Sequence, residues 1–139
     1  MKILKYMLLI VGVSFAANNI SAPALAGDDP ARGKKVFKKC KACHKIVAGK
    51  KSIGPSLHGM FGRKAGTLKK FKYSKDMKAA GKKGLVWNAE TFVAFIAKPK
   101  KYLGSVIGKK RARTKMSFNG LKKSKDRVDL LSYLMKVTK

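Results

Sequence analysis

The sequence of 139 residues has few cysteines, few histidines and few acidic residues. It has only two cysteines, so no second pair is available to complete a four-cysteine zinc site. Six Asp and Glu residues stand against 34 Lys and Arg residues, which leaves the chain strongly basic. No segment alternates apolar and polar residues with the period of a β-strand, and no internal repeat is present. These absences, with the length, predict a single all-α domain.

The sequence also lacks an apolar run long enough to predict a membrane-spanning helix. Residues 6–17 are apolar and uncharged, but a span needs about 20 such residues. They follow a short basic start, and residues 24–26 (Ala-Leu-Ala) match a signal-peptide cleavage site. We therefore expect residues 1–26 to be a secretory signal peptide and residues 27–139 to be the mature domain. An uncleaved segment that anchors the domain to a membrane is the alternative.

The two cysteines lie in the stretch Cys40-Lys41-Ala42-Cys43-His44, which is the attachment signature of c-type haem. On a helical turn both thiols project to one side, where they can bond to the two vinyl groups of one porphyrin. His44 then offers a neutral imidazole nitrogen to the iron as an axial ligand. We expect one covalently attached haem c, with its iron, as the cofactor. A redox dithiol or a disulfide is the alternative.

The surplus of basic residues is the second strong feature. Removal of the signal peptide takes away Lys2 and Lys5 and no acidic residue, so the net charge falls from +28 to +26. Such a charge produces a long-range field that speeds association with acidic surfaces. Nucleic acid is the usual partner of so basic a chain, but an exported protein seldom meets it. Acidic protein surfaces and, more weakly, anionic lipid surfaces are therefore the expected partners.

Capping residues predict two helices in the first half of the mature chain. The first begins at Asp28-Asp29-Pro30, where one of the two aspartates serves as N-cap and proline suits the first helical position. Its Gly33 lies on the inward side, where a glycine allows close contact with another helix. The second helix spans residues 74–80, with Ser74 as its N-cap and Gly81 at its C-terminal end.

Two further helices are predicted in the second half of the chain. One follows Asn88 as N-cap and ends before Pro99, because a proline disfavours helical backbone in the residue that precedes it. The last begins with Ser124 as N-cap, and its apolar stripe places Met135 in the core. Residues 104–113 between them are polar and basic and predict a loop.

Residues 45–73 are punctuated by glycines and predict a long loop, which suits the wrapping of a flat cofactor. Pro55 has a carbonyl that could accept the second ring N–H of His44 and fix its tautomer. His58, the only other histidine, could be a second iron ligand, but a hydrogen bond that fixes the loop is the favoured interpretation. Trp87 could donate its N–H to a haem propionate, with ordinary core packing equally open.

The ligand on the opposite face of the iron decides the class of function. An open face is typical of a sensor, a gas carrier or a peroxidase, whereas a methionine thioether there is typical of an electron carrier with a raised potential. Of the four methionines of the mature chain, Met135 is expected in the core and Met77 in the short helix. Met60 lies in the glycine-rich loop and Met116 in a polar segment, and composition does not choose between these two.

Several stretches carry a family resemblance. They are, in order, Gly33-Lys-Lys-Val-Phe37, CKACH, Gly54-Pro-Ser-Leu-His-Gly-Met-Phe-Gly-Arg-Lys-Ala-Gly66, Phe71-Lys-Tyr73, Trp87, Pro99-Lys-Lys-Tyr102, Thr114-Lys-Met-Ser-Phe118 and Asp129-Leu-Leu-Ser-Tyr-Leu134. In order and content they resemble the small single-haem cytochromes c of the mitochondrial and bacterial respiratory type, over nearly all of residues 27–139. The resemblance implies a cytochrome c fold, in which three to five helices and long loops surround one covalently attached haem.

The resemblance also implies roles for individual residues. Met116 would be the distal iron ligand, and Pro55 the hydrogen-bond acceptor of the proximal histidine. A haem propionate would be surrounded by Arg63, Tyr73 and Trp87, with Ser74 and Thr114 nearby. Lysines would ring the exposed haem edge, among them Lys38, Lys39, Lys51, Lys100, Lys101 and Lys115.

Some features depart from the family pattern. Phe95 stands where the family often has tyrosine, and residues 104–113 are longer than in mitochondrial members. Because mitochondrial members lack an export signal, the chain resembles a bacterial, periplasmic member.

The function implied is that of a monomeric carrier of single electrons, not an enzyme. It would pass electrons from a quinol–cytochrome c reductase to a terminal oxidase by docking on acidic faces of these membrane complexes. A haem peroxidase or ligand-binding protein with an open iron is one alternative, and a membrane-anchored carrier is another.

Overall fold

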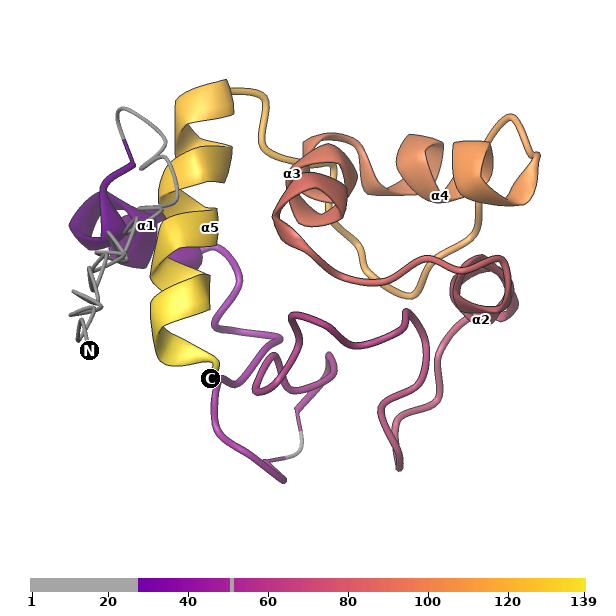
Figure 1. Cartoon of the computed structure of the whole chain (residues 1–139), viewed down its shortest axis with the longest axis horizontal. Helices are drawn as coiled ribbons and strands as arrows, with labels where there is room; N and C mark the ends of the chain where they lie inside the picture. Colours follow the sequence, from indigo (N-terminus) through magenta and orange to yellow (C-terminus); the bar gives the residue numbers. More distant parts are fainter. Residues whose placement is uncertain (1–27, 51) are drawn as a thin grey trace, which may run out of the picture.

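The computed structural model describes residues 28–50 and 52–139, and the expected signal peptide and Lys51 lie outside them. Within these residues the chain forms five helices and no sheet (Figure 1). The only β-type pairing there is an isolated antiparallel bridge between Lys64 and Val86. The helices are α1 (Pro30–Phe37), α2 (Lys75–Lys82), α3 (Ala89–Ala97), α4 (Pro99–Ile107) and α5 (Ser124–Val137). The predicted all-α architecture with long loops is confirmed.

Helices α1 and α5 lie side by side and form the most extensive contact between any two of these helices (Figure 1). A Cβ atom on Gly33 would collide with the backbone oxygen of Asp129, so only glycine allows this approach. The rings of Phe37 and Tyr133 pack beside the crossing, with centroids 5.6 Å apart. The predicted close contact at Gly33 is therefore confirmed, and it joins the two ends of the domain.

A buried carboxylate fastens the same two helices together. Asp129 accepts the backbone N–H of Asp29 at 2.9 Å, the Arg32 guanidinium at 3.0 Å and the Lys125 ammonium at 3.2 Å. Burial alone would raise the pKa of Asp129, but these hydrogen bonds outweigh it and hold the pKa below its usual value. The Asp29 carboxylate in turn accepts the N–H groups of Ala31 and Arg32, which makes it the N-cap of α1, as predicted.

Side-chain caps begin α2 and α3 where the sequence predicts them. The Ser74 hydroxyl accepts the backbone N–H of Met77 at 3.1 Å. Asn88 and Thr91 form a reciprocal capping box, in which each side chain accepts the other's backbone N–H, at 2.8 and 2.9 Å. These caps fix the points at which the long loops turn into helix.

The prediction of a loop over residues 104–113 is wrong for residues 104–107, which belong to α4. Pro99 ends α3 but also opens α4 at its first position, where a proline has the required φ and no N–H is needed. Helix α4 ends at Gly108, whose φ of +74° is readily adopted only by glycine.

Two other boundary predictions are wrong. Gly81 lies inside α2, where a Cβ atom would collide with the backbone oxygen of Ala65, so this glycine serves packing rather than helix termination. Ser124 is the first residue of α5 and not, as was predicted, its N-cap. The N-cap is Lys123, whose side chain makes no capping hydrogen bond.

The placement of Met135 in the core is also wrong, because this residue is 45% exposed. The buried face of α5 consists instead of Leu130, Leu131 and Leu134. Helix α5 therefore presents a narrower apolar face than its sequence suggests.

Candidate functional site

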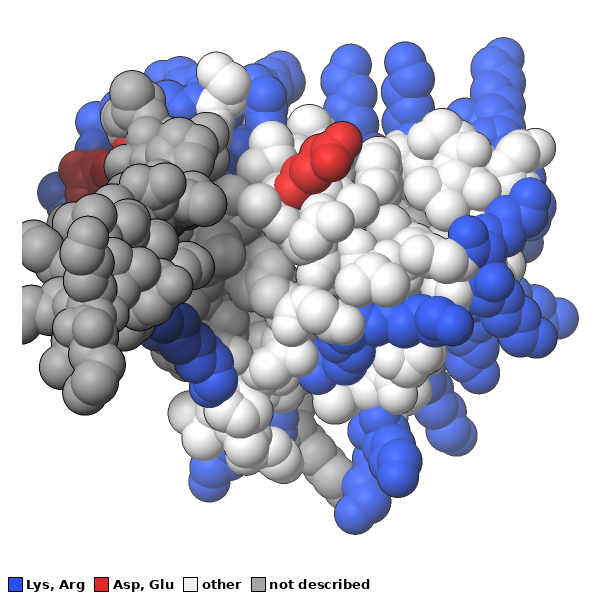
Figure 2. Space-filling model, in the orientation of Figure 1, with Lys and Arg blue, Asp and Glu red and all other residues white. Residues whose placement is uncertain are grey.

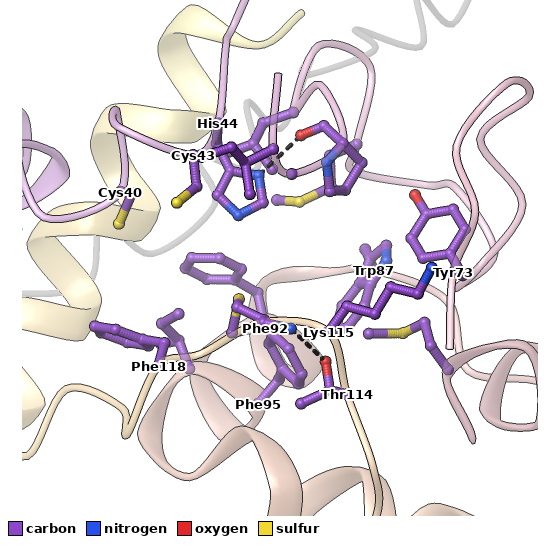
Figure 3. Close-up of a pocket in the computed structure, with 18 of the residues that line it drawn as sticks. Cys40, Cys43, His44, Tyr73, Trp87, Phe92, Phe95, Thr114, Lys115 and Phe118 are labelled. Atoms are coloured by element: carbon purple, nitrogen blue, oxygen red, sulfur yellow. Dashed lines mark hydrogen bonds between the residues drawn. The ribbon is translucent and has the colours of Figure 1, made fainter. Parts of the chain in front are cut away.

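One cavity gathers every residue that the sequence predicts for the cofactor site. Its walls include Cys40, Cys43, His44, Pro55, Arg63, Tyr73, Ser74, Trp87, Thr114 and Met116. Figure 3 shows the cysteines and His44 on one side, with Phe92, Phe95 and the segment 114–118 across the gap. Residues more than 70 positions apart thus face one another across a single slot.

The CxxCH stretch continues α1 as a further helical turn. Backbone N–H groups of Cys43 and His44 donate to the Cys40 carbonyl oxygen at 3.0 and 2.9 Å. As a result, both sulfurs and the imidazole are directed into the cavity (Figure 3). This is the arrangement that lets two thiols and one axial ligand reach the same planar group.

The chemistry of the thiols argues against a redox dithiol. Cys40 and Cys43 are both free. Burial raises the pKa of Cys40 to about 11, an effect that Lys39 partly counteracts and Cys43 reinforces. A reactive thiol needs a stabilised thiolate, so this environment makes Cys40 a poor nucleophile.

His44 is held in one orientation and one tautomer. Its Nδ1 atom lies 2.8 Å from the Pro55 carbonyl oxygen, and because that oxygen can only accept, Nδ1 carries the proton. Burial lowers the pKa of His44, and the bond to Pro55 offsets this only in part. The ring is therefore neutral near pH 7, with the lone pair of Nε2 available as a metal ligand.

Gly54 is the reason that the imidazole fits. A Cβ atom at this position would lie 2.6 Å from Cε1 and 2.8 Å from Nδ1 of His44. The Gly54 N–H also donates to the Cys43 carbonyl oxygen at 2.7 Å, which ties the loop to the CxxCH turn. The sequence alone does not predict this role, since nothing in the local sequence reports a contact between residues ten positions apart.

Three methionines line the cavity, including one that sequence analysis placed only in a short helix. Met60 and Met77 are buried, and Met116 is half-buried. The Met116 N–H donates to the Thr114 hydroxyl at 3.1 Å, which fixes the turn that carries Met116 (Figure 3). All three thioethers are thus near enough to the cavity to be weighed as ligands.

His58 is not among the described residues that line the cavity. Its backbone N–H donates to the Ser56 hydroxyl, and its carbonyl oxygen accepts from Arg63. The hydrogen bonds of His58 that fix the loop are therefore made by its backbone.

The polar side chains form one rim of the cavity. Arg63 donates to the carbonyl oxygens of Ser56 and His58, both at 3.2 Å, which holds its guanidinium in place. Burial raises the pKa of Tyr73, while the Arg63 charge lowers it. Trp87 is buried and its ring packs edge-on against Phe95, with centroids 4.9 Å apart.

The remaining wall is apolar. It includes Phe92, Phe95, Ile96, Phe118, Leu130 and Leu134. Phe92, Phe95 and Ile96 are the buried residues of α3, so this helix presents its apolar face to the cavity. Such a wall excludes water from the cavity and suits a flat apolar ligand.

In the part of the chain that the structure describes, no helix is long and apolar enough to cross a bilayer.

Comparison with known proteins identifies the family. The family model for cytochrome c matches residues 30–138. Cytochrome c2 of Cereibacter sphaeroides is 43% identical over 125 residues, which covers 83% of this chain and 86% of the relative. Cytochrome c2 of Rhodobacter capsulatus is 38% identical over 138 residues, which covers 94% and 97%. The crystal structure of cytochrome c2 from Rhodobacter sphaeroides matches with a TM-score of 0.72 at 42% identity, covering 80% of this chain and 97% of that one. The chain belongs to the cytochrome c family, is similar to the cytochromes c2 over most of its length, and is an electron carrier rather than an enzyme.

Proposed function

We propose that the chain binds one haem c covalently through Cys40 and Cys43, with His44 and Met116 as the axial ligands of its iron. The observation that carries this proposal is the convergence of two free thiols and a neutral, oriented imidazole on one apolar cavity. When bound, the haem supplies a centre that gains and loses single electrons.

The residues present fit such a group. Among residues 28–50 and 52–139, no three His, Cys, Asp or Glu side chains come together to hold a metal ion. His44 and Met116, which both line the cavity, would hold the iron, and a porphyrin would supply its other ligands. Figure 3 shows Cys40, Cys43 and His44 separated by an open gap from Phe92, Phe95 and Phe118, and the planar porphyrin would lie in this gap.

The protein's own side chains then have distinct tasks. The Pro55 carbonyl oxygen accepts the hydrogen bond from the Nδ1–H of His44, which raises the basicity of His44 as a ligand and fixes its ring. The rim of Arg63, Tyr73 and Trp87, with Ser74 and Thr114, offers donors for the haem propionates. The apolar wall keeps water out, so the surroundings change little when charge moves on or off the site.

We further propose that the protein works in the periplasm after removal of its signal peptide. Its donor would be a quinol–cytochrome c reductase and its acceptor a terminal oxidase, each met through an acidic docking face. The bacterial cytochromes c2 among its relatives and the strong positive charge support this assignment.

Mass spectrometry of the purified protein tests the covalent attachment of haem and the removal of the signal peptide in one measurement. We expect a chain that begins at Gly27 and carries the additional mass of one haem. Acid–acetone extraction should leave the colour with the protein, because the haem is bonded to two cysteines. Replacing Cys40 and Cys43 with serine should remove the added mass and leave an unstable apoprotein. A colourless precipitate from the unaltered chain would contradict the proposal.

A further inference from the structure

A buried serine adjoins the cavity without lining it. Ser56 is 7% exposed and directly follows Pro55, which is part of the cavity wall. Among the residues that the structure describes between Phe37 and Met60, Ser56 is the only buried one. A serine is usually exposed, and when it is buried its hydroxyl is engaged in hydrogen bonds. The partners of Ser56 therefore indicate what it does.

The loop between His44 and Pro55 lies in a solvated part of the molecule. Figure 2 shows Lys and Arg side chains along the upper, right and lower outline of the molecule, and residues 45 and 47–50 of the loop are exposed. A segment with so little buried surface depends on its hydrogen bonds to keep one conformation. The hydrogen bonds at the base of this loop therefore decide how closely Pro55 faces His44.

Two backbone hydrogen bonds close the base of the loop, one on either side of Pro55. The Gly54 N–H donates to the Cys43 carbonyl oxygen at 2.7 Å. The Leu57 N–H donates to the Lys45 carbonyl oxygen at 2.8 Å. Pro55 has no N–H to contribute, and its ring fixes only its own φ. The direction of its carbonyl therefore depends on its ψ and on the φ of the next residue.

That next residue, Ser56, spans the base of the loop with its hydroxyl. The hydroxyl donates to the Val47 carbonyl oxygen at 2.9 Å, and the Lys45 carbonyl oxygen lies farther away, at 3.4 Å. The hydroxyl oxygen also accepts the backbone N–H of His58 at 3.2 Å. Because a hydroxyl can donate one hydrogen bond while it accepts another, the side chain is held from both sides of the loop.

The backbone of Ser56 is held as well. Its carbonyl oxygen accepts an N–H of the Arg63 guanidinium at 3.2 Å. On the other side of Ser56, the Pro55 carbonyl oxygen lies 2.8 Å from Nδ1 of His44. With its side chain and its carbonyl both fixed, Ser56 leaves the Pro55 carbonyl little freedom to turn away from the imidazole.

We propose that Ser56 is a positioning residue, whose hydroxyl holds the Pro55 carbonyl oxygen against His44 and thereby helps to set the reduction potential. This inference rests on the proposed function, in which His44 is an axial ligand of the haem iron. A hydrogen bond donated by Nδ1 makes the imidazole a more basic ligand. A more basic ligand favours the oxidised iron and lowers the potential. Loss of the Ser56 hydroxyl should loosen this hydrogen bond and raise the potential.

The test compares two variants of the holoprotein that each lose one buried hydroxyl. Ser56→Ala removes the hydroxyl that spans the loop. Thr138→Val removes a hydroxyl that is 2% exposed and donates to the Leu134 carbonyl oxygen at 2.7 Å. Thr138 does not line the cavity, and its backbone oxygen still accepts the Gly59 N–H in the variant. Both changes should lower the free energy of unfolding, because each leaves a carbonyl without its donor.

Two measurements report on His44 itself. NMR of the reduced protein gives the rate at which the Nδ1 proton exchanges with deuterium, and a potentiometric titration gives the reduction potential. Ser56→Ala should speed this exchange at least about tenfold more than Thr138→Val does, which corresponds to about 1.4 kcal/mol. At a fixed applied potential, Ser56→Ala should raise the ratio of reduced to oxidised protein at least about twofold, or about 18 mV for one electron. Thr138→Val should leave this ratio unchanged.

Equal effects of the two variants on exchange and on potential would show that Ser56 contributes only stability. A potential that falls in Ser56→Ala would show that its hydroxyl does not strengthen the hydrogen bond of His44. Either result would overturn the inference and leave the proposed function standing. The proposed function is tested separately in the unaltered oxidised protein, where the NMR signals of His44 should carry the large shifts that bonding to the iron produces. Their absence would contradict the proposed function, and this inference with it.

Discussion

At the scale of single residues, the three methionines that line the cavity are alternatives for one role. Met116 is expected to be the iron ligand, because the resemblance to the cytochromes c implies it and Thr114 fixes its turn. Met116→Ala should abolish the sulfur-to-iron charge-transfer band, lower the reduction potential and let carbon monoxide bind to the reduced protein. Absorption spectra and a potentiometric titration measure these changes.

Met60→Ala and Met77→Ala are the matched controls, since both remove a thioether from the same cavity. Each should cost stability, by about 2–5 kcal/mol for a buried methionine, while the band stays in place. If the band disappears in Met60→Ala or Met77→Ala and persists in Met116→Ala, the ligand assignment is wrong.

The residues of the site could be predicted to different degrees. Cys40, Cys43 and His44 lie within five consecutive positions, and their spacing predicts one shared site, which agrees with the single cavity that all three line. Met116 could not be separated from Met60 by composition, because a methionine in a polar segment has no local mark of a ligand. Gly54 was missed altogether, since its role depends on a distance to His44 that only the folded loop creates.

At the scale of elements, the crossing of α1 and α5 depends on Gly33. Gly33→Ala places a methyl group against the backbone of Asp129 and the Cβ atom of Tyr133. Overpacking of this kind costs about 1–3 kcal/mol. Because the methyl group would meet backbone atoms, which cannot turn away, we expect a cost in the upper part of that range, above the roughly 1 kcal/mol that alanine gains over glycine as a helix former. Chemical denaturation should therefore show a lower free energy of unfolding.

Lys35→Ala is the control for this change, because it alters an exposed position of the same helix. Its effect should stay within about 0.5 kcal/mol. A Gly33→Ala protein that is more stable than the unaltered one would show that the crossing has room for a side chain.

The carboxylate of Asp129 should make the same crossing sensitive to acid. Because hydrogen bonds hold its folded pKa below the ordinary value of about 3.9, its contribution is complete above that value. As the pH falls further, the unfolded chain is protonated first, so stability is lost until the pH passes the folded pKa. Asp129→Asn should cost about 1–3 kcal/mol near neutral pH, because Arg32 and Lys125 lose an anionic hydrogen-bond partner but, being half-exposed, remain solvated.

Urea denaturation from about pH 6 to about pH 3 measures this effect as the difference between the two proteins. The difference should be constant at the upper end and shrink at the lower end. A difference that is independent of pH would mean that Asp129 acts through packing rather than through its charge.

The elements that the sequence predicts well are those with a side-chain cap. Asp29, Ser74 and Asn88 begin helices where expected, because each satisfies backbone N–H groups with its own oxygen. Helix α4 was missed because Pro99 is both a terminator of one helix and a favourable first residue of the next. Gly81 was misassigned because a glycine that allows close packing has the same sequence signature as one that ends a helix.

At the scale of the whole molecule, the net charge is the dominant property. Removal of the expected signal peptide leaves +26, whereas solubility of a small domain needs only about 2–8 net charges. Attraction to an acidic docking face should raise the association rate about 10- to 1000-fold at low salt. At physiological ionic strength the Debye length is only about 8 Å, so much of this gain should disappear. Stopped-flow rates of electron transfer to an oxidase across a salt series test this expectation.

The position of the charges should matter as well as their number. Lys115 lies at the cavity, Lys38 follows α1 two residues before Cys40, and Lys101 is on α4, whereas Lys136 and Lys139 lie near the C-terminus. All five are exposed, so each reversal to glutamate changes the net charge equally and disturbs packing little. Reversal of any of the first three should slow electron transfer more than reversal of either C-terminal lysine, because only charges inside the contact remain unscreened when the partners dock. An electron-transfer rate that does not change with salt concentration would show that long-range electrostatic attraction does not speed association. Equal slowing by all five reversals would mean that association depends only on the net charge of the protein, and that the surface around Lys38, Lys101 and Lys115 is not the docking face.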